Sequence, residues 1–158
     1  MTHDEITKWL SKQVVGNHTI GEDGVVNTQC SVSLFKFKDS VIPVQFGIVD
    51  GYFDISITSV TSLSGIPHTI CGSFALNGAP IQSLSGIHKK VKLIDGRVIC
   101  SDYMTHVLGL LLIAGVKSIT VSGGPKIEGI LNKYLPTRDV ISAQDDLIEA
   151  GYIKHANL

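Results

Sequence analysis

One part of the chain repeats itself at a fixed spacing. The segment Gly51-Tyr-Phe-Asp-Ile-Ser56 is followed by Thr61-Ser-Leu-Ser-Gly-Ile-Pro67. The same order of residue types recurs 21 residues later, as Gly72-Ser-Phe-Ala-Leu-Asn77 and then Gln82-Ser-Leu-Ser-Gly-Ile-His88. A constant period of this length is typical of repeat architectures, in which each unit buries its apolar edge against its neighbours.

The same register extends upstream of this stretch. It also continues downstream, after three extra residues near Lys89 to Asp95. Five strand-like segments then share two apolar columns: Val32/Leu34, Phe53/Ile55, Phe74/Leu76, Val98/Cys100 and Ile119/Val121. Alternate residues of a strand point to the same face. We therefore expect these segments to pair side by side in parallel with both columns inside, and Leu63 and Leu84 to close the far side of the coil. Gly65 and Gly86 suit turns with positive φ.

Both ends of the chain are predicted to be helical. Thr2 and Glu5 form a capping-box pattern before a helix to Lys12. Pro125 begins a second helix, and a third runs from about Ser142 to Ala150. The pattern predicts one α/β domain over 1–158, a short β-solenoid with parallel strands. It would consist of an N-terminal helical cap (1–15), about five repeats (22–122) and a C-terminal helical cap (123–158).

Composition narrows the range of partners. Lys and Arg number 13 against 14 Asp and Glu, a formal net charge of −1, so we expect neither nucleic acid nor membrane as a partner. The polar N-terminus carries no secretory signal pattern. The longest apolar run, Val107 to Val116, is too short to cross a bilayer. Three cysteines with no paired spacing favour free, buried thiols in a reducing compartment. Together these features predict a cytoplasmic protein.

Several segments resemble a known family. Val49-x-Gly-x-Phe-Asp-Ile-Ser56 followed by Thr61-Ser-Leu-Ser-Gly-Ile-Pro67 resembles the leucine-rich-repeat-like proteins of large tailed bacteriophages, with repeats of the form VxGxFxCSxNxLTSLxGxP. The resemblance runs from about Trp9 to the end of the chain. Its flanking segments are Asn17 to Gly24, Pro43 to Gly51, Leu110 to Val116, Ile130 to Leu135 and Gln144 to Gly151. Thr58, Ala79 and Tyr103 replace the asparagine of the family pattern.

The resemblance implies a fold class and a setting, and no enzymatic activity that can be transferred. It implies a short leucine-rich-repeat-like β-solenoid, and a phage protein that works in the cytoplasm of the bacterial host. Most members of the family are uncharacterised.

The residues that invite a catalytic or metal-binding interpretation do not assemble into a site on sequence grounds. His18-Thr19 and His68-Thr69 superficially resemble motifs of two-histidine phosphoesterases, but adjacent strand residues point to opposite faces. Ser122 to Lys126 lacks the spacing of a phosphate-binding loop. The acidic group Asp145, Asp146 and Glu149 is typical of a solvated helix face. We predict no catalytic residue, no metal and no cofactor.

The outward-facing strand positions remain as a candidate surface. Most are small and uncharged, and the exceptions are Tyr52, Asp54, Arg97, Phe35 and Ile99. Tyr and Arg are enriched at binding hot spots. We therefore expect a protein-binding module that holds a host or viral protein against this face during infection. A solvated sheet with occasional large side chains stays an alternative. So do self-assembly and a small enzyme or ligand-sequestering protein with a pocket between the last repeat and the C-terminal helices.

Overall fold

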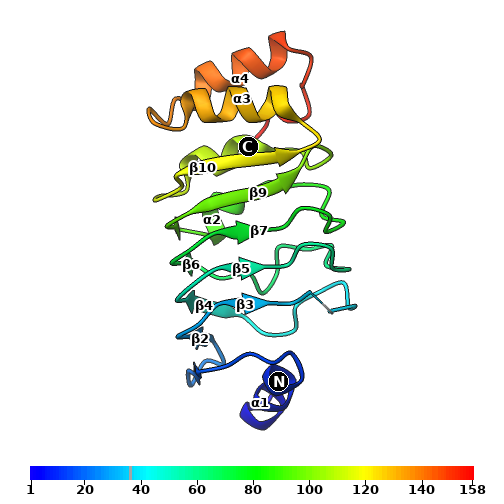
Figure 1. Cartoon of the computed structure of the whole chain (residues 1–158), viewed down its shortest axis with the longest axis vertical. Helices are drawn as coiled ribbons and strands as arrows, with labels where there is room; N and C mark the ends of the chain where they lie inside the picture. Colours follow the sequence, from blue (N-terminus) through cyan, green and yellow to red (C-terminus); the bar gives the residue numbers. More distant parts are fainter. Residues whose placement is uncertain (36) are drawn as a thin grey trace.

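The computed structural model describes residues 1–35 and 37–158, and its strands stack along one long axis with helices at both ends (Figure 1). Five strands form an all-parallel sheet in the order β10-β9-β7-β5-β3. These strands are β3 (Val32–Ser33), β5 (Phe53–Asp54), β7 (Phe74–Ala75), β9 (Arg97–Ser101) and β10 (Ser118–Ser122). Their register aligns Val32, Phe53, Phe74, Val98 and Ile119. The side-by-side pairing predicted from the repeat is therefore confirmed.

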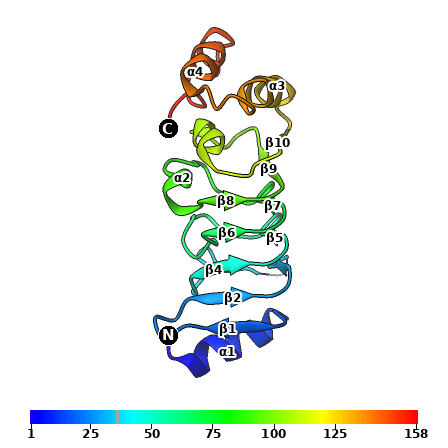
Figure 2. The ribbon, with the colours of Figure 1, turned by 90° about the vertical axis from the view of Figure 1, so that its left-hand side faces the viewer.

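A second sheet overturns the predicted fold class. Its order is β1-β2-β4-β6-β8, and β1 pairs with β2 antiparallel while the other pairs are parallel (Figure 2). These strands are β1 (His18–Ile20), β2 (Val26–Thr28), β4 (Phe46–Val49), β6 (Thr69–Ile70) and β8 (Leu93–Ile94). The chain is a mixed α/β protein with one mixed and one parallel sheet. The prediction of a short leucine-rich-repeat-like β-solenoid was wrong.

The error arises because the strands of the second sheet repeat one inward apolar residue and not an alternating pair. Their register aligns Val49, Ile70 and Ile94 in a single column, whereas the predicted segments share two columns. Tertiary packing selects the strands β6 and β8, because Ile70 and Ile94 are fully buried in the same core as Phe53 and Phe74. At the N-terminal end, the turn at Gly24 (φ +78°) reverses the chain and makes the first pair antiparallel.

The interior contains a row of aromatic rings from both sheets. Phe46, Phe53 and Phe74 are fully buried, with ring centroids 5.3 Å apart for the first pair and 6.0 Å for the second. Leu63 and Leu84 are buried as predicted. Gly65 has φ +79°, and a Cβ atom there would lie 2.6 Å from the carbonyl oxygen of Val44. Glycine is therefore required at this turn.

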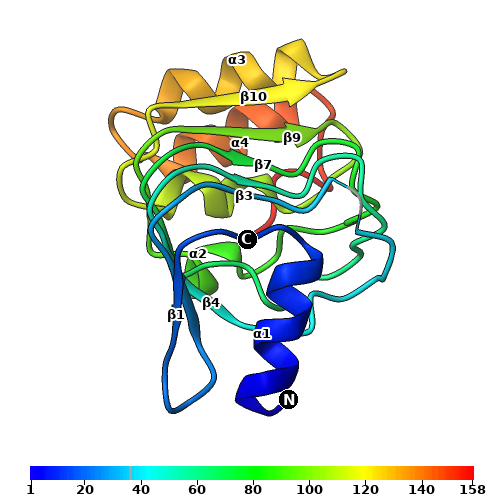
Figure 3. The same cartoon turned by 60° about the horizontal axis from the view of Figure 1, so that its bottom comes forward.

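The N-terminal helix begins as predicted. Helix α1 (His3–Lys12) follows Thr2, and both hydrogen bonds of the capping box with Glu5 are present. Ile6 and Leu10 are buried, and Trp9 packs edge-on against Phe37 with ring centroids 5.7 Å apart. The helix lies beside the hairpin of β1 and β2 at the N-terminal end of the molecule (Figure 3).

The region predicted to hold three extra residues, Lys89 to Asp95, begins within helix α2 (Ile87–Lys90). The apolar run after His106 forms a 3-10 helix, η1 (Val107–Leu112). Within the described ranges, no helix is both long enough and apolar enough to span a membrane.

Two side chains that stand in place of the asparagine of the repeat pattern form hydrogen bonds to the loop backbone. Thr58 Oγ1 donates to the carbonyl of Ile55 at 2.7 Å, and Tyr103 OH donates to the carbonyl of Ala79 at 2.7 Å.

Two helices close the C-terminal end. Helix α3 (Pro125–Tyr134) lies along β10, and α4 (Val140–Glu149) packs beside it (Figure 1). Helix α4 begins two residues earlier than predicted, because Asp139 caps it by accepting a hydrogen bond from the Ser142 amide at 3.0 Å.

The prediction of buried thiols holds for Cys100, while Cys71 is exposed and Cys30 half-buried; all three are free. Burial, assisted by the Glu128 carboxylate, raises the pKa of Cys100 to about 12.

Candidate functional site

Four of the five predicted surface residues flank one strand of the parallel sheet. The register of β5, β7 and β9 aligns Phe53, Phe74 and Val98, so the preceding residues Tyr52, Ser73 and Arg97 form one row. Asp54, Ala75 and Ile99 form the next row that faces outward. Because neighbouring strands lie about 4.8 Å apart, the two outer residues of each row are about 10 Å apart. We call these two rows the strand-face site.

The strand-face site has large side chains on both flanks and small ones along β7. Tyr52 is 49% exposed and Arg97 is exposed, while Ser73 and Ala75 between them offer little volume. Arg97 is held in place from two sides. Its Nε donates to Ser118 Oγ at 3.3 Å, and its backbone amide donates to Ser73 Oγ at 3.2 Å. The site thus presents an aromatic ring and a guanidinium over a flat floor.

Asp54 is already engaged within its own loop. Its Oδ1 accepts hydrogen bonds from the Ser56 amide at 2.8 Å and from the Ser56 hydroxyl at 2.6 Å. These bonds fix the turn after β5. The negative charge therefore lies at a defined place beside the floor of the site, opposite the half-buried Ile99 on β9.

The fifth predicted residue, Phe35, lies apart from the other four. Leu34 donates its amide to the carbonyl of Asp54, which places Phe35 beyond the carboxyl end of β5, far along the strand direction from Tyr52. Phe35 is 61% exposed and forms a ridge between two hollows. The smaller, about 240 Å³, is lined by Lys12, Gln13, Val14, Ser33, Leu34 and Phe35. The larger, about 690 Å³, is lined by Phe35, Phe37, Lys38, Ile57 and Ser59.

Two further residues, which the sequence analysis did not predict, are exposed beside Phe35. Val14 is 89% exposed and Ile57 is 68% exposed. Both have left-handed backbones, with φ +58° and +54°, which β-branched residues rarely adopt. A signal for Ile57 was present, because the residue one repeat later is Gly78, also with positive φ (+75°). We call Val14, Phe35 and Ile57 the apolar corner.

A third hollow lies at the surface of the C-terminal helices, and its position differs from the pocket of the ligand-sequestering alternative. Its volume is about 410 Å³ and it is lined by Lys126, Ile130, Asp146, Glu149 and Ala150. These residues all belong to α3 and α4 or directly follow them, so the hollow lies between the two helices and not between the last strand and the helices.

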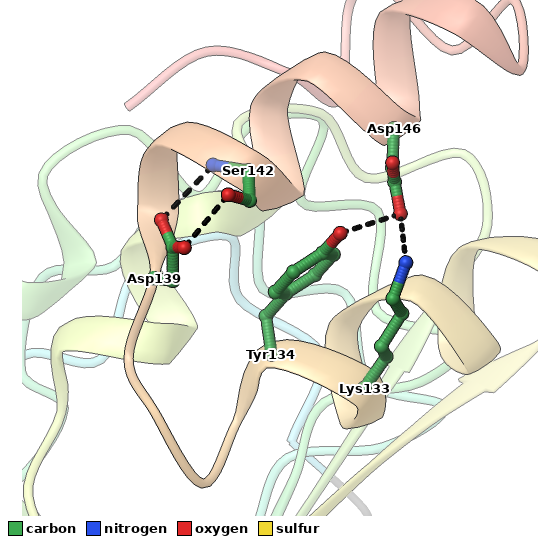
Figure 4. Close-up of polar contacts among 5 residues, drawn as sticks. All are labelled: Lys133, Tyr134, Asp139, Ser142 and Asp146. Carbon is green, nitrogen blue, oxygen red and sulfur yellow. Dashed lines mark hydrogen bonds and ion pairs between the residues drawn. The ribbon is translucent and has the colours of Figure 1, made fainter.

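Two carboxylates of this region, Asp139 and Asp146, have structural partners (Figure 4). Asp146 accepts hydrogen bonds from Lys133 Nζ at 2.7 Å and from Tyr134 OH at 2.8 Å, and these lower the pKa of the Asp146 carboxyl. The same contacts raise the pKa of Lys133. The amide and hydroxyl of Ser142 lower the pKa of Asp139. The contacts of Asp146 join α4 to α3, and those of Asp139 cap the N-terminus of α4.

The histidines are dispersed. In residues 1–35 and 37–158, no group of three or more His, Cys, Asp or Glu side chains is placed to hold a metal ion. His106 Nδ1 lies 3.0 Å from Ser83 Oγ and 2.9 Å from Thr105 Oγ1. Because two hydroxyls share this one nitrogen, the contacts fix the left-handed turn at His106 (φ +60°) and do not dedicate a base to a single nucleophile.

Comparisons with known proteins provide no relative: no family model, no curated protein and no solved structure matches the chain.

Proposed function

We propose that this chain is a protein-binding module and that its strand-face site holds the partner. The proposal extends to a phage accessory protein that engages a host or viral protein in the bacterial cytoplasm, on the strength of the family resemblance described above. An interface of this kind needs an anchor of Tyr, Trp or Arg beside well-packed neutral contacts. The flat strip of Ser73 and Ala75 between Tyr52 and Arg97 meets that requirement.

The observation that carries the proposal is the alignment of Tyr52 with Arg97 in one row. The two side chains that most often dominate interface energetics flank a floor that a partner backbone can approach closely. The Arg97 side chain also donates a hydrogen bond to Ser118, so less side-chain entropy is lost when a partner binds. A sheet face that contacts only solvent does not need an arginine side chain held in one position.

The test is capture of a partner from a lysate of infected bacterial cells on the immobilised full chain. Tyr52→Ala combined with Arg97→Ala is expected to abolish capture and to leave the melting temperature unchanged, because both side chains are exposed. The matched control is Ile48→Ala with Lys92→Ala, two exposed residues associated with the other sheet, which should capture normally.

Persistence of capture in the double variant would show that the strand face is not the binding surface. A change in mass with concentration, measured by analytical ultracentrifugation of the purified chain, would favour self-assembly as the use of this face.

A further inference from the structure

The apolar corner is a second exposed surface, distinct from the strand-face site. Val14 follows α1, Phe35 follows β3, and Ile57 follows β5, so three separate segments each contribute one exposed apolar side chain. Phe35 lines both adjacent hollows, which join the three residues into one continuous surface. Contiguous exposed apolar surface of this kind on a globular protein marks an interaction site.

The backbone conformation of this surface is costly. Both Val14 and Ile57 are β-branched and have φ near +55°, where Cβ collides with the backbone. The neighbouring repeat uses Gly78 at the position of Ile57 and avoids this cost. Neither side chain recovers the cost by burial, since they are 89% and 68% exposed. Strain maintained without a gain in packing is characteristic of functional positions.

The corner has a defined shape and a basic rim. Its floor contains Leu34, which is buried, and Phe37, which is fixed from behind by the edge-on contact with Trp9. Each hollow is lined by one lysine, Lys12 in the smaller and Lys38 in the larger. In the described ranges the ion pairs are Lys117 with Asp95 and Lys133 with Asp146, so neither rim lysine is neutralised by one.

From this combination we propose that the apolar corner binds a short protein segment that carries apolar side chains next to acidic ones. The apolar side chains fill the two hollows on either side of Phe35, and the carboxylates pair with Lys12 and Lys38.

Two other occupants fit the same surface less well. In a two-fold dimer the same patch of each copy meets its counterpart, which would bring like-charged lysines together. A membrane surface would also be attracted by the lysines, but its binding strength scales with the apolar area buried, and the corner offers three apolar side chains. Here the apolar side chains border hollows of about 240 and 690 Å³.

The test is selection of peptides from a random display library on the immobilised full chain, followed by titration of one synthetic peptide from the selected set. Trp9 is the single tryptophan and contacts Phe37 behind the larger hollow, so its fluorescence reports binding without a label. We expect selected peptides rich in Asp or Glu beside Leu, Ile or Phe. Phe35→Ser and Ile57→Gly should each lower the affinity for the peptide at least about tenfold.

Charge variants separate the apolar and ionic contributions. Lys12→Glu with Lys38→Glu should abolish binding of the acidic peptide, and Lys89→Glu with Lys90→Glu, the same charge change on the exposed part of α2, should leave it intact. Tyr52→Ala with Arg97→Ala should also bind the peptide normally, so failure of the strand-face proposal and failure of this one are distinguishable.

Three results would overturn the proposal. These are selection of no peptide, selection of peptides without acidic residues, and equal binding by the Phe35→Ser variant. Vesicles of anionic phospholipid serve as the competing probe. Sedimentation of the protein with vesicles that is lost in Phe35→Ser would assign the corner to a membrane surface instead.

Discussion

Ile57 and Gly78 occupy equivalent positions in successive repeats, and both have positive φ, yet only one of them bears a side chain. Ile57 donates its amide to the backbone carbonyl of Asn77, and Gly78 donates its amide to the side chain of Ser101, so both amides are bonded to the next repeat. The backbone therefore imposes the left-handed conformation independently of the side chain. The left-handed conformation of Ile57 therefore raises the free energy of the folded state and leaves that of the unfolded state unchanged.

This comparison predicts an inverted order of stability at one position. Ile57→Gly should be more stable than Ile57→Ala by about 1 kcal/mol, because alanine keeps the Cβ that collides in the left-handed region while glycine does not. Denaturant unfolding of the two variants measures the difference. The same pair of substitutions at Ser59, an exposed residue with ordinary φ, should give the usual order, with alanine favoured. If alanine is favoured at Ile57 too, the backbone there is not left-handed.

Residues that fill the core were predictable from the sequence, whereas of the apolar corner only Phe35 was. Phe53 and Phe74 stand one period apart and are both fully buried, because burial imposes the same residue type at each repeat. An exposed position has no such constraint. Val14 lies outside the repeat and its exposure follows from the turn after α1, which no periodic pattern encodes.

At the scale of elements, the free edge of the parallel sheet is closed by side chains of a helix. Strand β10 is last in its sheet, which leaves its outward backbone groups without a strand partner. Asn132 of α3 accepts a hydrogen bond from the Ile119 amide at 2.9 Å and donates one to the Ile119 carbonyl at 2.6 Å. Glu128 accepts from the Val121 amide at 2.8 Å. Two side chains thus imitate a neighbouring strand.

The importance of this edge can be measured. Asn132→Ala should lower the free energy of unfolding by about 1–3 kcal/mol, because it leaves the part-buried amide and carbonyl of Ile119 unpaired. Asn132→Asp retains an acceptor for the amide but no donor for the carbonyl, so it should be intermediate. Amide hydrogen exchange at Ile119 should accelerate in both variants while that of Phe53 stays slow. Equal exchange rates in the wild type and Asn132→Ala would contradict the edge assignment.

The predictability of elements followed the signals that their own residues carry. The helix after Thr2 was found because a capping box marks its start, and the helix from Pro125 because proline suits a first turn. The strands β6 and β8 were missed, since each contributes one inward apolar residue, Ile70 and Ile94, where the predicted strands share two apolar columns. The mixed sheet, and with it the correct fold class, depends on those short strands and on the hairpin of β1 and β2.

The molecule as a whole is elongated, and each strand of the parallel sheet is paired only with its immediate neighbours in the stack (Figure 1). In such an arrangement, stability is approximately a sum of local terms, so one end can loosen without the other. The two carboxylates with lowered pKa values, Asp139 and Asp146, both lie in the C-terminal helical region. The ends of the molecule should therefore differ in their response to acid.

A carboxyl group whose pKa is lower in the folded state stabilises that state above the unfolded value, here the ordinary value of 3.8, and the contribution is lost as the pH falls through the folded pKa. For Asp146 the largest cause of the lowered pKa is the hydrogen bond from Lys133, followed by that from Tyr134. On acidification below 3.8, the contact between α3 and α4 should therefore weaken before the sheets are affected.

Amide NMR signals recorded between pH 6 and pH 2 give the measurement. Signals of α4 should broaden or shift at higher pH than those of β5 and β7. Asp146→Asn should show a loosened α4 already at neutral pH and a weaker dependence on acid, because the charged hydrogen bond to Lys133 is absent throughout. Asp145→Asn removes the adjacent, exposed charge and should keep the wild-type profile. Simultaneous loss of helix and sheet signals would mean that the C-terminal helices and the stacked strands form one cooperative unit.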